Sequence, residues 1–269
     1  MKTRNTLLFL LTFLMLCSCV QDANANSNPP EDGPAPETPE GFPVFGEHSY
    51  FEVPQVSELS GMCLNSDRTA LAVVGDEGTL AFVGFDGKTE VRGNFGKDFE
   101  GITADPAGNF LFAEEGGQAV YRSKAPSYGT PECLFFVKDA VDGNFGNKGL
   151  EGISYYKDDV LFVGAQKDAT LWKYGADGTC LSKIILTTVT SEIKEVAGLC
   201  YDADEDWLWV SDSKAGKIFI FTPEGKLLAG YDVSYIDNAE SLCLDRKNRC
   251  LWVGSDEKPS RIYRISLSF

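Results

Sequence analysis

The sequence predicts an all-β fold, a five-bladed β-propeller whose blades are four-stranded antiparallel sheets. Two observations predict it: one short motif recurs five times, and the interval between copies is about the length of a propeller blade. The copies begin at Glu58, Asp98, Gly149, Glu195 and Asn238. Their aligned positions are Ser60, Glu100, Glu151, Ala197 and Glu240, in steps of 40, 51, 46 and 43 residues. A period of about 40 to 50 residues built from short strands is typical of one blade per repeat.

Each repeat has room for four short strands joined by tight turns. In the first repeat we expect strands at residues 60–64, 70–75, 80–85 and 90–95. The dipeptide Asp86-Gly87 separates the last two, and Asp-Gly is a strong signal for a two-residue hairpin turn. Apolar residues occupy both faces of most strands, as expected where each sheet packs between two neighbours.

The two ends of the repeat region predict how the ring closes. The chain stops after the strand expected at 261–267, so the fifth repeat lacks its outermost strand. One unpaired candidate strand, at 48–53, precedes the first repeat. We expect it to complete the last blade, which leaves few exposed sheet edges. A six-bladed alternative would hide a degenerate blade between residues 121 and 147, where there is room for one outer strand and a loop.

The N-terminal residues predict export and a lipid anchor. Residues 1–18 combine a positive start with an apolar run too short to span a bilayer comfortably. The run ends in Leu16-Cys17-Ser18-Cys19, which resembles the lipobox of a bacterial lipoprotein, and the resemblance implies that Cys19 carries the lipid. An ordinary secretory signal is the alternative. Residues 19–43, rich in Pro, Asn and Glu, are expected to form a disordered tether, and 44–269 the propeller. The expected location is the cell envelope, at the outer membrane on either side.

Charge limits the classes of partner. The formal net charge is −16, and loss of Lys2 and Arg4 with the signal peptide would make it −18. This excess argues against nucleic acid and anionic lipid surfaces, and favours metal ions, polyamines or basic protein segments. The membrane would be reached only through the N-terminal lipid, and we expect a monomer.

Six cysteines lie beyond the leader. Cys63, Cys200 and Cys243 share one repeat position, a small-residue slot on the innermost strand that holds Thr103 and Ser154 in the other repeats. Free cysteine suits such a slot as a small hydrophobe. The others, Cys133, Cys180 and Cys250, lie on other strands; we expect them reduced and buried, although an oxidising compartment would permit a bridge among them.

Carboxylates are predicted to converge on one rim of the channel. Because the first two strands of a blade are antiparallel, the start of the first and the end of the second lie at the same end of the ring. The candidate ligand-binding residues there are Glu58, Asp76, Asp98, Glu114, Lys148, Asp212 and Asp256. The candidate metal ligands, on the innermost strands, are Glu100, Glu151 and Glu240.

Calcium is the cofactor that this pattern favours. Converging carboxylates repel one another unless a cation lies among them, and Ca²⁺ takes six to eight oxygen ligands. The rim offers no His and no paired Cys, which argues against zinc. The alternative is a solvated acidic mouth without an ion. A second acidic pattern, Asp202-x-Asp204-x-Asp206, lacks the Gly and the closing Glu of a calcium loop, so a polar turn is expected there. The four Trp residues lie on or beside strands and are expected to pack between blades.

The motifs also carry a family resemblance. In order along the chain they are Glu58-Leu-Ser-Gly61, Asp98-Phe-Glu-Gly101, Asn147-Lys-Gly-Leu-Glu-Gly152, Glu195-Val-Ala-Gly198 and Asn238-Ala-Glu-Ser241. From residue 58 to 269 the chain resembles the SdiA-regulated (YjiK-like) family of exported bacterial proteins. The resemblance implies a propeller and export from the cytoplasm. The chain departs from the family pattern at Glu114-Glu115 and Gln166. The inner-strand Glu-Gly pairs are more distantly similar to those of calcium-dependent lactonase and paraoxonase propellers.

Three functions remain open. The first is a non-catalytic lipoprotein that binds a cation or cationic ligand at the acidic rim. The second is a calcium-dependent hydrolase of esters, lactones or phosphate esters, and the third is a protein-interaction scaffold. The binding function is favoured over an enzyme, because the only histidine, His48, falls on the expected outermost strand and no Ser-His or Cys-His arrangement can be built.

Overall fold

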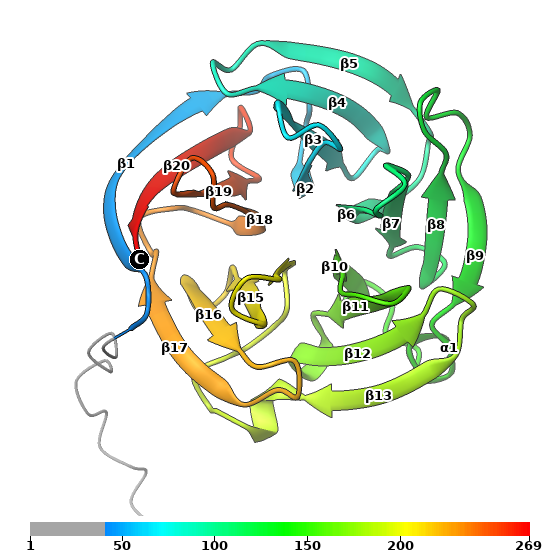
Figure 1. Ribbon diagram of the computed structural model, residues 1–269. Helices are drawn as coiled ribbons and strands as arrows, with labels where there is room; N and C mark the ends of the chain where they lie inside the picture. Colours follow the sequence, from blue (N-terminus) through cyan, green and yellow to red (C-terminus); the bar gives the residue numbers. More distant parts are fainter. Residues whose placement is uncertain (1–40) are drawn as a thin grey trace, which may run out of the picture. The chain divides into compact units, whose positions relative to one another are not determined.

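Five four-stranded antiparallel sheets surround a central channel in the computed structural model (Figure 1). The structure describes residues 41–269, so the predicted signal peptide, Cys19 and most of the predicted tether lie outside the described residues. Within residues 41–269, no helix is long and apolar enough to cross a membrane. The five-bladed prediction is confirmed, and the six-bladed alternative is wrong.

The blades follow one another in chain order. Blade 1 contains β2 (Leu59–Leu64), β3 (Ala70–Gly75), β4 (Thr79–Gly84) and β5 (Thr89–Asn94). Blade 2 contains β6 (Phe99–Ala104), β7 (Phe110–Glu114), β8 (Ala119–Ser123) and β9 (Glu132–Phe136). Blade 3 contains β10 (Leu150–Tyr155), β11 (Val160–Ala165), β12 (Thr170–Gly175) and β13 (Cys180–Ile185). Blade 4 contains β14 (Gly198–Asp202), β15 (Trp207–Asp212), β16 (Lys217–Phe221) and β17 (Leu227–Asp232). Blade 5 contains β18 (Ala239–Asp245), β19 (Cys250–Ser255) and β20 (Arg261–Ser268), completed by β1 (Val44–Glu52).

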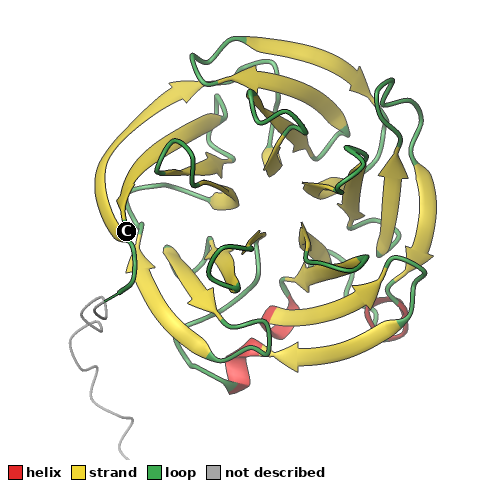
Figure 2. Ribbon diagram, in the orientation of Figure 1, coloured by secondary structure: helices red, strands yellow, loops and turns green. Residues whose placement is uncertain are grey.

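Few residues are helical. The interval that could have hidden a sixth blade holds β9 and one short helix, α1 (Lys138–Asp142). Two 3-10 turns, Lys167–Ala169 and Leu186–Thr188, complete the helical segments of the described part of the chain, and all of these segments lie outside the sheets (Figure 2).

The N-terminal strand closes the ring as predicted. Strand β1 pairs with β20 from Val44 opposite Ser268 to Glu52 opposite Arg261. The ring of Phe45 stacks on that of Tyr231 of blade 4, with the ring centroids 4.1 Å apart. The Tyr231 hydroxyl donates to the Pro43 carbonyl at 2.8 Å. Phe42 stacks on Trp207 at 4.9 Å. Packing of the chain on blade 4 therefore begins at Phe42, within the segment 19–43 that was predicted as the tether.

The core lies between the blades. Five clusters of buried apolar residues each join two adjacent blades, so every boundary of the ring has its own core. Trp172, Trp209 and Trp252 are buried in these clusters, and Trp252 of blade 5 stacks on Phe85 of blade 1 at 5.4 Å. The predicted inter-blade packing of these three residues is confirmed.

The cysteine predictions are only partly correct. Cys63, Cys200 and Cys243 lie on the innermost strands β2, β14 and β18, as expected. All six described cysteines are free, and Cys250 is buried. The prediction that Cys133 and Cys180 are buried was wrong. Both are exposed, because each lies on the outermost strand of its blade, where one face meets solvent.

The repeated glycine of the motif is required by the close approach of the inner strands. A Cβ on Gly101 of β6 would lie 2.2 Å from the backbone oxygen of Glu151 on β10. A backbone atom cannot rotate away as a side chain can. The motif glycine therefore sets how closely the blades meet at the channel.

Replacing this glycine should destabilise the ring. We expect Gly101→Ala to lower the free energy of unfolding by about 3 kcal/mol, as overpacking in a tight core does, measured by urea denaturation. Gly93→Ala is the matched control, because a Cβ on Gly93 meets nothing within 4 Å. Equal stability of the two variants would contradict the close-approach argument.

Candidate functional site

Four residues at the start of the inner strands reach the channel mouth because each lies in a β-bulge. The pairing register shifts between Leu59 and Gly61, between Phe99 and Gly101, between Leu150 and Ile153, and between Ala239 and Ser241. The residues left out of the ladder include Ser60, Glu100, Glu151 and Glu240. A bulge re-aims the side chain of its extra residue. The local backbone thus presents three carboxylates and a hydroxyl at one mouth.

These residues line a cavity of about 180 Å³ at the mouth, here called the acidic mouth. Six carboxylates and three neutral polar side chains form its walls: Asp76, Glu100, Glu115, Glu151, Glu240, Asp256, Ser60, Asn147 and Gln166. Each of blades 1, 2, 3 and 5 contributes a carboxylate. Blade 4 has Ala197 at the motif position, and its nearby Glu195 is instead buried against Ser213 and Lys214.

Three carboxylates come together closely enough to share one cation. Oxygen atoms of Asp98, Glu100 and Glu115 all lie within 4.8 Å of one another. Asp98 precedes β6, Glu100 lies in its bulge, and Glu115 follows β7, as the antiparallel pairing of β6 with β7 requires. The Glu115 carboxylate is held by the backbone N–H of Gly149 at 3.0 Å.

The carboxylates of the mouth are poorly neutralised. Burial, with the negative charges of Asp76 and Asp98, raises the pKa of Glu100 to about 9. Burial, with Glu195 and Asp256 nearby, raises the pKa of Glu240 to about 7. The pKa of Glu151 rises well above its usual value for the same reasons, burial first and then Glu100 and Glu240. A cation would reverse these shifts.

The mouth also contains an unsatisfied acceptor. One carboxylate oxygen of Asp256, Oδ1, is buried and has no hydrogen-bond partner among residues 41–269. Burial is the first cause of the raised pKa of Asp256, and Glu58 is the second. A buried acceptor with no donor fits a site that expects a positively charged ligand.

Some predicted site residues lie outside the cavity. Glu114 accepts the Gly117 N–H at 2.8 Å, and Asp212 accepts the N–H groups of Glu195 at 3.3 Å and Ala215 at 2.8 Å. These two carboxylates stabilise the turns that follow β7 and β15. Glu58 pairs with Lys258 at 3.3 Å at the edge of the mouth.

The metal-ligand candidates Glu100, Glu151 and Glu240 line the cavity together with Asp76 and Asp256, and Asp98 joins the three-carboxylate cluster. Sequence reasoning did not select Glu115, Asn147 or Ser60. The position of Asn147 just before the third motif was the available signal for it.

A second cavity of about 400 Å³, here called the lysine cavity, adjoins the acidic mouth through Gln166, which lines both. Its basic residues are Lys148, Lys167, Lys194 and Lys214. Lys167 and Lys194 donate to the backbone carbonyls of Gly143 and Ser191 at 3.1 and 2.6 Å, and Lys214 pairs with Glu195. Lys148, a predicted ligand-binding residue, forms no ion pair with another residue of 41–269. A positively charged pocket therefore lies beside a negatively charged one.

The acidic turn of blade 4 is a polar turn, as expected. Asp202 forms a two-point ion pair with Arg246, and Asp206 accepts the Tyr201 hydroxyl at 2.5 Å. Both carboxylates are occupied by protein donors.

Fold and site together define a five-bladed propeller with an acidic channel mouth. The chain belongs to the phytase-like family, whose description is esterase-like activity of phytase and whose sequence model matches residues 54–268. No curated protein matches the chain.

Solved structures with a similar fold include a glutaminyl cyclase of Myxococcus xanthus, at 12% identity and a TM-score of 0.60, over 84% of this chain and 96% of that one. A gluconolactonase of Xanthomonas campestris matches at 13% identity and a TM-score of 0.57, over 83% and 91%. A Bacteroides thetaiotaomicron protein of unknown function matches at 7% identity and a TM-score of 0.54, over 79% and 70%. At such identities the likeness concerns the fold alone.

Proposed function

We propose that the acidic mouth binds a divalent cation, Ca²⁺ by preference, and that the protein uses this site to hydrolyse an ester. The observation that carries the proposal is the convergence of Asp98, Glu100 and Glu115 oxygens within 4.8 Å, in a mouth lined by further carboxylates. The donor set fits a hard cation: it is all oxygen, includes the unpartnered Asp256 Oδ1, and offers neutral oxygens from Ser60, Asn147 and Gln166. Membership of a family described by esterase-like activity supports the hydrolytic part.

The residues of the acidic mouth would have separate roles in ion binding and in proton transfer. When bound, Ca²⁺ supplies Lewis acidity toward a carbonyl or phosphoryl oxygen. Glu100, Asp98 and Glu115 would hold the ion. The Glu240 carboxylate lines the same cavity and is not among the three residues proposed to hold the ion, so it would act as the general base that takes a proton from an attacking water.

The lysine cavity supports an anionic substrate. Lys148 and Asn147 are neighbours in sequence, and they line the lysine cavity and the acidic mouth respectively. An ester whose reacting group lies in the acidic mouth could place a phosphate or carboxylate beside Lys148. Among the ester classes considered, this arrangement favours phosphate esters over neutral lactones.

A non-catalytic function is the second candidate. The same carboxylates could bind a cation or cationic ligand without chemistry, or the propeller could serve as a protein scaffold. We also retain as proposals the SdiA-regulated (YjiK-like) assignment, the lipid on Cys19, a monomeric state, the absence of nucleic-acid partners, and an envelope location at the outer membrane. The resemblance of residues 16–19 to a lipobox supports the anchor.

Loss of one buried carboxylate should abolish both cation binding and turnover. In thermal melts, wild type should gain about 2.7 kcal/mol at Ca²⁺ concentrations a hundredfold above Kd, and Glu100→Gln should lose this gain. With p-nitrophenyl phosphate, p-nitrophenyl acetate and a lactone as substrates, we expect Ca²⁺-dependent turnover of the phosphate ester, reduced at least a hundredfold in Glu100→Gln.

Controls separate the two candidate functions. Glu47→Gln makes the same charge change on the exposed strand β1 and should alter neither readout. Lys148→Gln should leave the Ca²⁺ shift intact and raise KM for an ester that carries a second phosphate or carboxylate beside its reacting group. A Ca²⁺ shift without turnover of any substrate would favour the binding function, and no shift at all would overturn the cation site.

A further inference from the structure

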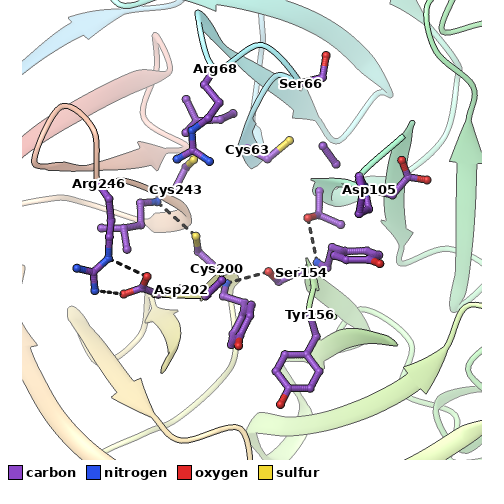
Figure 3. A pocket seen from close by; sticks show the side chains of 18 of the residues that line it. Cys63, Ser66, Arg68, Asp105, Ser154, Tyr156, Cys200, Asp202, Cys243 and Arg246 are labelled. Atoms are coloured by element: carbon purple, nitrogen blue, oxygen red, sulfur yellow. Dashed lines mark hydrogen bonds and ion pairs between the residues drawn. The ribbon is translucent and has the colours of Figure 1, made fainter. Parts of the chain in front are cut away.

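The opposite mouth of the channel has a different chemistry. A cavity of about 430 Å³ opens there, here called the thiol mouth, and the slot cysteines Cys63, Cys200 and Cys243 all line it. They come from β2, β14 and β18, the inner strands of three consecutive blades, 1, 4 and 5 around the ring. Figure 3 shows the three side chains at this mouth of the channel, with Ser154 of blade 3 next to Cys200.

Cys200 and Cys243 occupy the same repeat position on neighbouring inner strands, on either side of the boundary between blades 4 and 5. The backbone N–H of Leu244, the residue after Cys243, donates to the Cys200 sulfur at 3.3 Å (Figure 3). The same contact recurs elsewhere in the ring: Tyr155 N–H donates to Thr103 Oγ1 at 3.0 Å, and Tyr201 N–H donates to Ser154 Oγ at 2.9 Å. A hydroxyl therefore fills this structural role as well as a thiol does, so the role does not explain why three adjacent slots carry sulfur.

We propose that the thiol mouth is a binding site for a soft monovalent metal ion, Cu(I), held between the two sulfurs of Cys200 and Cys243. Thiolates select soft ions, and two or three sulfurs suffice for Cu(I). Structural zinc needs four ligands, and the only described histidine, His48, lies on the outermost strand β1, away from this mouth.

The surrounding charges fit this ion. Binding to two thiols releases two protons and leaves a complex of net charge −1. Arg68 lines the same cavity, where its positive charge acts on Cys200.

Hard cations are not favoured at this mouth. Asp202 is paired with Arg246. Asp105 accepts hydrogen bonds from the backbone N–H and the side-chain amide of Asn109, at 2.9 and 2.7 Å. The third carboxylate of the lining, Asp204, is exposed and lies 3.6 Å from the Arg246 guanidinium. The two ends of one channel would thus select ions of opposite character.

The test is competition for Cu(I) against bathocuproine disulfonate, in anaerobic buffer with ascorbate. The purified full-length chain would carry serine at Cys17, Cys19, Cys133 and Cys180 in every sample, so that only the channel thiols and buried Cys250 remain. We expect one equivalent of Cu(I) per chain. Cys200→Ser with Cys243→Ser should lower the apparent affinity at least a hundredfold, while the hydroxyls keep the hydrogen bonds between blades.

Matched variants make the outcome decisive. Thr103→Ser alters the same ring without removing sulfur and should bind Cu(I) as before. Far-UV circular dichroism and thermal melts would check folding, and Cys200→Ser alone serves if the double variant does not fold. Unchanged Cu(I) affinity in the folded serine variants, or no Cu(I) bound by the starting protein, would overturn the proposal. The acidic mouth is untouched in all these variants, so failure here leaves the calcium proposal standing.

Discussion

The cation-free protein should lose stability as the pH rises from about 5 to about 8, and Ca²⁺ should suppress this loss. Burial and neighbouring charge raise the folded-state pKa of Glu100 to about 9 and that of Glu240 to about 7. The folded state then binds more protons than the unfolded state between the ordinary Glu pKa and these values. The free energy of unfolding must therefore fall with rising pH across that window.

The size of the effect follows from the shifts. For Glu240 alone, moving from the ordinary value of 4.5 to about 7 corresponds to about 3 kcal/mol lost between these pH values. Glu100 adds to this loss over the same interval and continues to add to it up to about pH 9. Urea denaturation in EDTA at pH 5, 7 and 8.5 would measure the total, and repetition in CaCl₂ would show how much a bound ion restores.

The effect of Glu100→Gln on stability should have opposite signs in EDTA and in CaCl₂. In EDTA at pH 8.5, Glu100→Gln is expected to be more stable than wild type, because wild type must take up a proton at Glu100 or bury its charge when it folds, and glutamine needs neither. In CaCl₂ it is expected to be less stable, because a ligand is lost. A pH-independent stability in EDTA, or destabilisation of Glu100→Gln in both buffers, would contradict the account of an unneutralised mouth.

The propeller ring could be predicted because the same sequence motif occurs once in every blade. Five copies of one motif fix the number of blades, and the missing outer strand of the fifth copy predicts the closing strand β1. The short helix α1 was not predicted, since a single helical turn between two strands leaves no periodic signal. The exposure of Cys133 and Cys180 was misjudged because their strands were not identified as outermost.

The acidic mouth was predictable only in outline. Antiparallel pairing places the start of the first strand and the end of the second at one rim, so the convergence of Asp76, Glu100 and Glu151 follows from the repeat. Which second-strand carboxylates turn inward depends on the backbone of each turn. Glu115 reaches the cavity, whereas Glu114 and Asp212 accept N–H groups of the turns that directly follow their own strands, and no sequence pattern distinguishes these outcomes.

Removal of β1 should have the largest effect on folding. A chain that begins at Val53 lacks the strand that pairs with β20 and the Phe42 and Phe45 rings that pack on blade 4. The edge of β20 would be exposed, and an unpaired edge invites aggregation. We expect a loss above about 5 kcal/mol, comparable with the whole stability of an ordinary domain. The result would be an aggregated or unfolded protein at 25 °C by circular dichroism and size-exclusion chromatography.

The comparison should be made with a chain that begins at Gly41, because both then lack residues 1–40 and differ only in the closing segment. Adding a peptide of residues 41–52 should restore the fold of the shorter chain, since β1 makes its contacts through pairing and ring stacking that need no covalent link to Val53. Phe45→Ala, which removes the stack on Tyr231 and leaves the pairing intact, should cost about 3 kcal/mol. If the chain beginning at Val53 melted like the one beginning at Gly41, three strands would suffice for blade 5. Closure would then rest on the apolar clusters between blades and not on the N-terminal strand.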